Sequence, residues 1–509
     1  MLSSEEKHLS NTDDSMCKRP GGCQEDRLSL SGGTVHAKRI LGQNEQQMNN
    51  RLQEYMDTIC AISTPYGCGG IAVMRVSGKQ AIALTDRLFH GRRALSDIPA
   101  NTILFGHIER KGEVLDEALA SVFRAPHSFT GEDVVEISCH GSLYIQQTLL
   151  QWLIEAGCRM AKAGEFTQRA FLNGKMDLAE AEAVADLIAS QSKAEKDLAL
   201  SQLRGSISGE LQGLRERLLN FTSLIELELD FADHEELEFA DRSKLTALAQ
   251  EIEHKLTQLT HSFKTGNAIR NGIPVAIVGA TNAGKSTLLN ALVGEERAIV
   301  SDIRGTTRDT IEDTLVINGI LFRLIDTAGI RETGDQLEGM GIERSRQAAE
   351  KAQIIVQVID STSPQTDLFG INLTGKLLLQ VWNKADLCTI NQEPLTKNNR
   401  QCPAELTDSL SLSAKNGDVE VLKEALAKAA AEQMETTNTV TISNARHYEA
   451  LVRALEAIQR VQQGLQDGLS GEFLSMDLQD CLDALGEITG QVTSQEVLNN
   501  IFSHFCIGK

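Results

Sequence analysis

An apolar strand, a glycine-rich loop and a helix follow one another in the middle of the chain, and this order constrains the fold more than any other feature. The strand Ile273–Val278 leads into GATNAGKST at 279–287, and the helical run Leu288–Leu292 comes next. In such a loop the glycines let backbone NH groups converge on phosphates, Lys285 meets the β- and γ-phosphate charges, and the Ser286 hydroxyl can bind Mg²⁺. The loop therefore predicts a P-loop α/β domain that binds a nucleotide, and it leaves the base undecided.

Two later segments have the chemistry to reach the metal and the γ-phosphate. DTAG at 326–329 follows the apolar run Ile320–Ile325, so its aspartate lies at a strand end where it can hold the metal through water. The glycine of the same segment can approach the γ-phosphate. Thr307, within GTTRD at 305–309, is the natural second hydroxyl ligand of Mg²⁺ in a switch loop.

Two more segments identify the base as guanine. NKAD at 383–386 follows the strand Leu377–Val381, and the Asp386 carboxylate can accept hydrogen bonds from guanine N1 and N2. Adenine cannot supply these donors, so ATP would leave a polar acceptor unpaired. SAK at 413–415 offers a backbone NH to guanine O6. Each short string is common by chance, but all of them in this order, each at a strand end, predict a GTPase rather than an ATPase.

The catalytic step is less ordinary. Ras-like enzymes place a glutamine after the DxAG glycine to orient water, and here that position is Ile330. Acidic candidates nearby are Glu332, Asp335 and Glu338. A positive element for the transition state could be Arg331, a partner's residue, or a monovalent cation bound through the side-chain carbonyl of Asn282. Residue chemistry alone leaves these alternatives open.

Helical periodicity flanks the α/β domain on both sides. Apolar residues recur at spacings of three and four before it and again after it. Each half alone would leave an apolar stripe in water, so we predict one discontinuous helical bundle with the α/β domain inserted; two independent bundles are the alternative. The positions are Leu211, Leu214, Leu218, Phe221 and Ile225; Leu245, Leu248, Ile252, Leu256, Leu259 and Phe263; Leu451, Leu455, Ile458, Val461 and Leu465; and Leu474, Leu478, Cys481, Leu485 and Ile488.

From Thr58 to about Leu172, short apolar runs broken by turn residues alternate with helical stretches and predict a small α+β domain. The segment before it lacks apolar periodicity, and we predict a disordered extension, or upstream sequence if translation begins at Met56. The predicted parts are 1–55 (extension), 56–172 (α+β domain), 173–268 (helical, first part), 269–433 (G domain) and 434–509 (helical, second part).

Composition limits the partners and the compartment. With 49 Lys and Arg against 70 Asp and Glu, the net charge of −21 repels a phosphate backbone over most of the surface. Any contact with nucleic acid must therefore be local or supplied by a partner. The 10 cysteines follow no disulfide framework, so we expect a cytoplasmic protein. No apolar run is long enough to span a bilayer, so we expect no membrane contact.

Motifs outside the nucleotide site resemble the MnmE (TrmE) family of tRNA modification GTPases, from Thr58 to the end of the chain. They are ISTP at 62–65 with GGIAVMRVSG at 69–78, SFTGED at 128–133, GEFTQRAFLNGK at 164–175 and the terminal CIGK at 506–509. The resemblance implies an N-terminal domain that binds tetrahydrofolate and forms a homodimer, a helical domain in two segments and an inserted G domain. It also implies work on uridine 34 of tRNA in a heterotetramer with an FAD-containing MnmG (GidA) type partner.

The resemblance further implies particular site residues. Folate, as (6S)-5-formyltetrahydrofolate or a methylene-tetrahydrofolate relative, would contact Arg75, Glu136, Lys175 and Lys509. K⁺ would activate G-domain dimerisation and bind at Asn282, Ser301, Ile303 and Thr306, Mg²⁺ would bind at Ser286 and Thr307, and Glu338 would be the catalytic glutamate. The GTP-binding set is Asn282, Ala283, Gly284, Lys285, Ser286, Thr287, Ser301, Asp302, Ile303, Arg304, Gly305, Thr306, Thr307, Asp326, Thr327, Ala328, Gly329, Asn383, Lys384, Ala385, Asp386, Ser413, Ala414 and Lys415.

Two alternatives accompany this interpretation. A ribosome-assembly GTPase could share the G domain, but such proteins usually attach a basic RNA-binding module, whereas the flanks here are acidic helices. Cys506 could act as a nucleophile near the terminal Gly-Lys, although a lone cysteine beside Phe502 and Phe505 is more often a small core residue.

Overall fold

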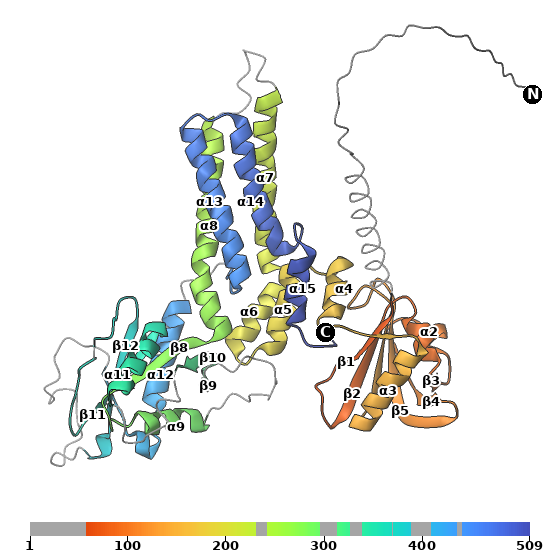
Figure 1. The fold of residues 1–509 in the computed structure, drawn as a ribbon, viewed down its shortest axis with the longest axis horizontal. Helices are drawn as coiled ribbons and strands as arrows, with labels where there is room; N and C mark the ends of the chain where they lie inside the picture. The colour runs from red at the N-terminus through yellow and green to blue at the C-terminus, as the bar shows by residue number, and fades with distance from the viewer. Residues whose placement is uncertain are drawn as a thin grey trace, which may run out of the picture. The chain divides into compact units, whose positions relative to one another are not determined.

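The structure is a computed structural model, and it describes residues 57–230, 242–295, 313–325, 338–368, 370–387, 409–434 and 440–508. The chain from Thr58 onward forms one compact unit. The predicted fold class is confirmed: a Ras-like P-loop domain is inserted in a discontinuous helical bundle and preceded by an α+β domain (Figure 1). The extension predicted at 1–55 lies outside the described residues. Because the chain from Thr58 onward is a single unit, the predicted boundaries within it stay predictions.

The N-terminal part is a sheet with α2 and α3 on one face, while on the other face Phe166 of α4 packs against Ile59 and Ala61 of β1. Its strands lie in the order β3-β4-β5-β6-β2-β1-β7, and side chains of α2 and α3 share a core with alternate residues of β2, β5 and β6. The opposite face carries exposed apolar side chains, among them Ile103, Phe105 and Leu119. The elements are β1 (Ile59–Ile62), β2 (Gly69–Ser77), α2 (Ala81–Asp86), β3 (Phe89–Gly91), η1 (Leu95–Asp97), β4 (Thr102–Arg110), β5 (Glu113–Phe123), β6 (Val134–Gly141), α3 (Leu143–Ala156) and β7 (Arg159–Met160).

The helices before and after the G domain form one bundle. A single apolar core unites buried residues of α7 and α8 with those of α13 and α14, so the alternative of two independent bundles is wrong. Within the predicted stripes, Leu248, Phe263 and Leu455 are only partly buried. The helices are α4 (Glu165–Leu172), α5 (Leu178–Ala189), α6 (Lys193–Leu203), α7 (Ser206–Asp230), α8 (Arg242–Asn271), α13 (Ala445–Gln466), α14 (Gly471–Thr489) and α15 (Gln495–Ser503).

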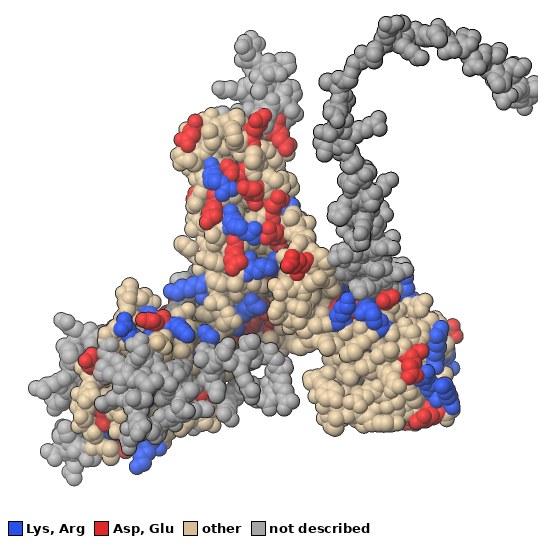
Figure 2. Space-filling model, in the orientation of Figure 1, with Lys and Arg blue, Asp and Glu red and all other residues tan. Residues whose placement is uncertain are grey.

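The surface of the bundle mixes both signs of charge. Figure 2 shows acidic and basic side chains interspersed along its helices. Exposed ion pairs between α13 and α14 join Arg453 to Glu487 and Arg460 to Asp477. Pairs of this kind contribute little to stability individually. Among the described residues, no helix is both long enough and apolar enough to cross a membrane.

The inserted G domain is a sheet covered on both faces. Its order is β13-β12-β11-β8-β10-β9, and every pairing is parallel except that of β9 with β10. Helices α9 and α12 pack on one face and α11 packs on the other, which explains the nearly continuous apolar strands. The elements are β8 (Ile273–Gly279), α9 (Lys285–Glu295), β9 (Asp313–Ile317), β10 (Ile320–Leu324), α11 (Glu338–Lys351), β11 (Ile354–Asp360), β12 (Leu377–Asn383), η2 (Ala385–Leu387), β13 (Ser409–Ser411), η3 (Ala414–Asn416) and α12 (Glu420–Met434).

Candidate functional site

The phosphate loop lies between the end of β8 and the start of α9, as the sequence predicts. Asn282 and Gly284 have φ angles of 64° and 95°, a left-handed backbone that turns neighbouring NH groups toward one side. The Lys285 ammonium spans the loop and donates to the carbonyls of Gly279 and Ala280 at 2.9 and 2.8 Å. Burial lowers the pKa of Lys285, so a phosphate at this position would restore favourable interactions to its charge. The loop therefore has the shape and charge that a polyphosphate requires.

Asn383 connects the phosphate loop to the segment that reads the base. Its side-chain nitrogen donates to the Ala283 carbonyl at 3.0 Å, and its side-chain oxygen accepts from the Ala414 NH at 3.0 Å. The side chain is almost fully buried, at 3% exposed. A Cβ added at Gly284 would overlap the Asn383 amide nitrogen, so this loop position must be glycine. One amide thus fixes the distance between the phosphate site and the base site.

The base-reading carboxylate is held at the ends of β12 and β13. The Ser413 hydroxyl donates to Asp386 at 2.7 Å, and Asp386 itself is exposed, so its carboxylate is oriented yet accessible to a ligand. Thr287 and Lys415 are also exposed, whereas Ser286 and Ala385 are partly buried. A carboxylate fixed in this way accepts hydrogen bonds and suits the adjacent N1 and N2 donors of guanine.

Asp360 is a member of the site that the sequence interpretation missed. It ends β11 and accepts from the Lys384 ammonium at 2.6 Å. Burial alone would raise the pKa of Asp360, but hydrogen bonds from Lys384 and Thr362 outweigh it and lower the pKa to about 2. The carboxylate therefore orients Lys384 beside the base-reading loop. In the sequence, the only indication of this role is the position of Asp360 at the carboxyl end of a predicted strand.

Several predicted residues lie outside the described part of the chain. The structure does not describe the loop residues. Of Glu338 it describes only the backbone, which begins α11. The predicted roles of all of them stay predictions. They are Ser301, Asp302, Ile303, Arg304, Gly305, Thr306 and Thr307 in the first loop, Asp326, Thr327, Ala328 and Gly329 in the second, the Glu338 side chain, and the terminal Lys509.

A second polar site lies on the face of the N-terminal sheet opposite α2 and α3, where α4 also packs. Arg75 on β2 and Glu136 on β6 are register partners, and they form an ion pair with nitrogen to oxygen distances of 2.7 and 2.8 Å. The Arg75 guanidinium carbon lies 5.5 and 5.6 Å from the ring centres of Phe129 and Phe166. A guanidinium, a carboxylate and two aromatic rings together suit a flat heterocycle that carries both hydrogen-bond donors and an anionic tail. Lys175 donates to the Pro126 carbonyl at 3.0 Å.

The C-terminal segment contacts this site. The Gly508 carbonyl accepts from the Ser63 hydroxyl at 3.2 Å and from Arg75 at 3.4 Å. Gly508 has a φ of 96°, and an added Cβ would overlap the Ile62 carbonyl, so only glycine permits this approach. Cys506 is exposed, which contradicts our expectation of a core cysteine; the chain turns after the buried Phe505 and leaves the thiol outside.

A buried ionic network beneath this site was also missed. Arg169 is 2% exposed, and it donates to Glu132 at 3.2 Å and to Glu165 at 3.0 Å. Arg159 donates to the same Glu165 at 2.6 Å. Burial would raise the pKa of Glu165, but Arg159, the Lys162 backbone NH and Arg169 together lower it. The network fixes the loop before β6 against α4. The sequence motifs contain these residues, but spacing alone does not show which charges meet.

The comparisons with known proteins cover almost the whole chain. A family model of the MnmE helical domain matches residues 178–506, and a model of the GTP-binding protein TrmE N-terminus matches residues 58–175. A relative from Parabacteroides distasonis, named tRNA modification GTPase MnmE, is 54% identical over 465 residues, 89% of this chain and 100% of the relative. The protein of the same name from Bacteroides thetaiotaomicron is 54% identical over 464 residues, 89% of this chain and 99% of that one.

A solved structure of the FeoB G domain from Methanococcus jannaschii is 25% identical to this chain. The alignment covers 31% of this chain and 96% of that one, with a TM-score of 0.21. A score this low supports no comparison of the two folds.

Proposed function

The chain belongs to the MnmE family, and on that premise we propose that it is the GTP-hydrolysing component of a complex that modifies C5 of the wobble uridine, U34, in tRNA. The group added is of the aminomethyl or carboxymethylaminomethyl type, with a folate as the one-carbon donor. One observation carries the proposal. A guanine-type site and the Arg75–Glu136 site lie in one chain that matches relatives named tRNA modification GTPase over their whole length.

The G domain binds GTP through the two segments that Asn383 connects. The phosphate loop takes the phosphates with its backbone NH groups and Lys285, and Asp386 reads guanine. Ser286 and Thr307 hold Mg²⁺, which neutralises charge on the β- and γ-phosphates when bound. The partly buried Ser286 hydroxyl, one residue after Lys285, suits that role. These residues bind and orient the nucleotide, while hydrolysis needs a further positive element.

That positive element is K⁺, bound at Asn282, Ser301, Ile303 and Thr306, and it acts when two G domains pair. The exposed Asn282 side chain, held in a left-handed backbone at the loop mouth, supports this assignment. We expect GTP turnover to rise about tenfold when Na⁺ is exchanged for K⁺ at constant ionic strength, because the proposed site holds K⁺ in preference to Na⁺ and a positive charge fixed there stabilises the transition state. Steady-state phosphate release measures it. Equal rates in the two salts would remove the cation from the mechanism.

Glu338 is the catalytic glutamate and acts through water, since the chain has Ile330 where Ras-like enzymes have a glutamine. The Glu338→Ala variant is therefore expected to keep its affinity for GTP and to lose about 100-fold in kcat. Single-turnover hydrolysis and nucleotide titration separate the two quantities. The matched control is Glu350→Ala, on an exposed position of the same α11, which should hydrolyse at the native rate. An unchanged kcat in Glu338→Ala would eliminate the assignment.

The Arg75–Glu136 site binds the folate donor, with Lys175 and Lys509 near its anionic tail. Arg75→Ala should weaken binding of 5-formyltetrahydrofolate about 30-fold, because a charge-assisted hydrogen bond and an aromatic-stacked cation are lost together. Titration calorimetry on the native chain measures it. Arg93→Ala, an exposed arginine in the same domain, is the control and should bind as the native chain does. No detectable folate binding by the native chain would undo the folate assignment.

The open face of the N-terminal sheet forms the homodimer. Ile103, Phe105 and Leu119 are 64%, 61% and 43% exposed, and Phe105 and Leu119 are register partners on adjacent strands. An apolar face of this kind marks an interaction surface, and it continues to the Arg75–Glu136 pair. A second copy would therefore cover the folate site as well. Sedimentation that shows only monomers at micromolar concentration would contradict the dimer.

An FAD-containing partner of the MnmG (GidA) type performs the redox step and completes a heterotetramer in the cytoplasm. The net charge of −21 supports a division of labour in which the partner holds most of the tRNA backbone. The whole proposal is tested by nucleoside analysis of tRNA from a strain that lacks the gene. We expect U34 without its C5 group; fully modified U34 in that strain would overturn the function, whatever the GTPase rate of the purified protein.

A further inference from the structure

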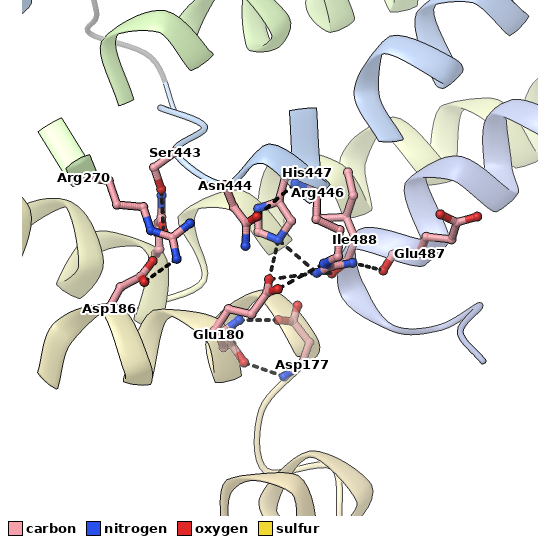
Figure 3. Close-up of polar contacts among 12 residues, drawn as sticks. Asp177, Glu180, Asp186, Arg270, Ser443, Asn444, Arg446, His447, Glu487 and Ile488 are labelled. Atoms are coloured by element: carbon pink, nitrogen blue, oxygen red, sulfur yellow. Dashed lines mark hydrogen bonds and ion pairs between the residues drawn. The ribbon is translucent and has the colours of Figure 1, made fainter. Parts of the chain in front are cut away.

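Helix α5 binds both chain segments that join the bundle to the G domain. On the outgoing segment, Arg270 in the last turn of α8 donates to Asp186 of α5 at 2.7 Å, three residues before β8 begins (Figure 3). On the returning segment, Arg446 and His447 in the first turn of α13 contact Glu182 of α5 at 2.8 and 2.7 Å. The two carboxylates, one helical turn apart, thus hold the entry to the G domain and the exit from it.

The two connecting segments are also fixed to each other. The Ile442 NH donates to the Ser262 hydroxyl of α8 at 3.0 Å. A Cβ at Gly266 would overlap the Ile442 carbonyl, so the backbone of α8 and that of the returning segment are in direct contact there. Gln202 of α6 donates to the Thr441 carbonyl at 3.1 Å and to the Ser443 hydroxyl at 3.0 Å. A displacement of the G domain would therefore act on both segments together and reach α5 through its two carboxylates.

The opposite end of α5 lies near the folate site. The helix begins at Leu178, three residues after Lys175, with a capping box made by Asp177 and Glu180 (Figure 3). Leu178 shares a small apolar core with Phe502 and Phe505, directly before the C-terminal segment. The carbonyl of Gly508 in that segment accepts from Arg75. A shift of α5 would therefore be transmitted to the segment that contacts the folate site.

The two carboxylates differ in how firmly they are held. Burial would raise the pKa of Glu182, but His447 and Arg446 outweigh it and lower the pKa to about 2. Burial instead keeps the pKa of Asp186 raised in spite of Arg270. A cavity of about 220 Å³, lined in part by Asp186, Gln202, Arg270 and Ser443, adjoins the second pair. The Asp186–Arg270 pair therefore has room to rearrange, while Glu182 stays fixed.

From these contacts we infer that Glu182 and Asp186 are positioning residues that make α5 the link between the nucleotide state of the G domain and the affinity of the folate site. The inference rests on the proposed function. Neither carboxylate is among the residues that we propose to bind nucleotide or folate. Their effect appears as a coupling between two binding sites, which is reciprocal and measurable as a ratio of affinities.

The experiment measures the Kd of 5-formyltetrahydrofolate for the full chain, once with GDP and once with a non-hydrolysable GTP analogue in K⁺. We expect the two Kd values of the native chain to differ at least about fivefold, a usual size for coupled sites. In Asp186→Asn the ratio should fall to within about twofold of one, with nucleotide affinity unchanged in the absence of folate. Glu182→Gln should behave alike; if it fails to fold, Asp186→Asn decides alone.

The control is Asp480→Asn, which removes an exposed carboxylate from the same bundle and should keep the native ratio. A purely structural role for Asp186 would lower the unfolding temperature without changing the ratio. A native chain that binds folate equally in both nucleotide states overturns the coupling and leaves the proposed folate site standing. A native ratio retained in Asp186→Asn overturns the assignment to α5, and a native chain that binds no folate overturns both proposals.

Discussion

Replacing Asp386 with asparagine is expected to weaken GTP binding by about 1,000-fold and to make XTP the better ligand. The Ser413 hydroxyl fixes the Asp386 carboxylate in an accessible position. In the variant an amide NH₂ would face the N2 donor of guanine, so one hydrogen bond is lost and two donors oppose each other. Xanthine carries an oxygen at C2, which can accept from that NH₂.

Competition binding of GTP and XTP to the native chain and to the variant measures the reversal. Asp418→Asn makes the same chemical change at an exposed position after η3, in the loop that follows β13, and should leave the preference for GTP intact. If Asp386→Asn bound GTP with native affinity, another residue would read the base, and Asp386 would not exclude ATP.

Gly284→Ala is expected to weaken nucleotide binding by more than roughly 100-fold and to lower the free energy of unfolding by about 3 kcal/mol. Two causes act together. The φ of 95° at this position is unfavourable for alanine, and the added methyl group would displace the Asn383 amide. Because Asn383 holds both the Ala283 carbonyl and the Ala414 NH, the phosphate loop and the base-reading loop would separate.

Nucleotide titration and chemical unfolding of the same preparation measure the two quantities. Gly294→Ala is the matched control, because an added Cβ there meets nothing within 4 Å. That variant lies in α9 and should be as stable as the native chain or up to about 1 kcal/mol more stable. Native affinity in Gly284→Ala would show that Asn383 does not set the spacing of the two loops.

The nucleotide site could be predicted from the sequence because its parts are local. A strand that runs into a glycine-rich loop and then a helix needs no distant partner to be recognised, and NKAD and SAK each lie at a strand end. The direction of parallel strands then brings these ends to one edge of the sheet. Asp360 also lies at a strand end, but this position does not show that its carboxylate meets Lys384, which is 24 residues away.

The site on the N-terminal sheet could be predicted only from the resemblance to a family, because its residues are far apart in the sequence. Arg75 and Glu136 are 61 residues apart, and only the strand register makes them partners. The exposed thiol of Cys506 shows the limit of composition rules, because a residue beside two buried phenylalanines still faces water when the chain turns after them.

The sequence by itself determined the order of the elements, the apolar faces of the long helices, and the phosphate and base motifs. These features depend on periodicity and on groups a few residues apart, and such local patterns can be recognised without knowledge of the fold. Only the tertiary structure decided which charges meet: Glu182 pairs with Arg446 across 264 positions of chain, and Asp186 pairs with Arg270 across 84. A carboxylate can be satisfied by any suitably placed cation, so its partner is fixed by the packing of the whole bundle and not by its neighbours in sequence.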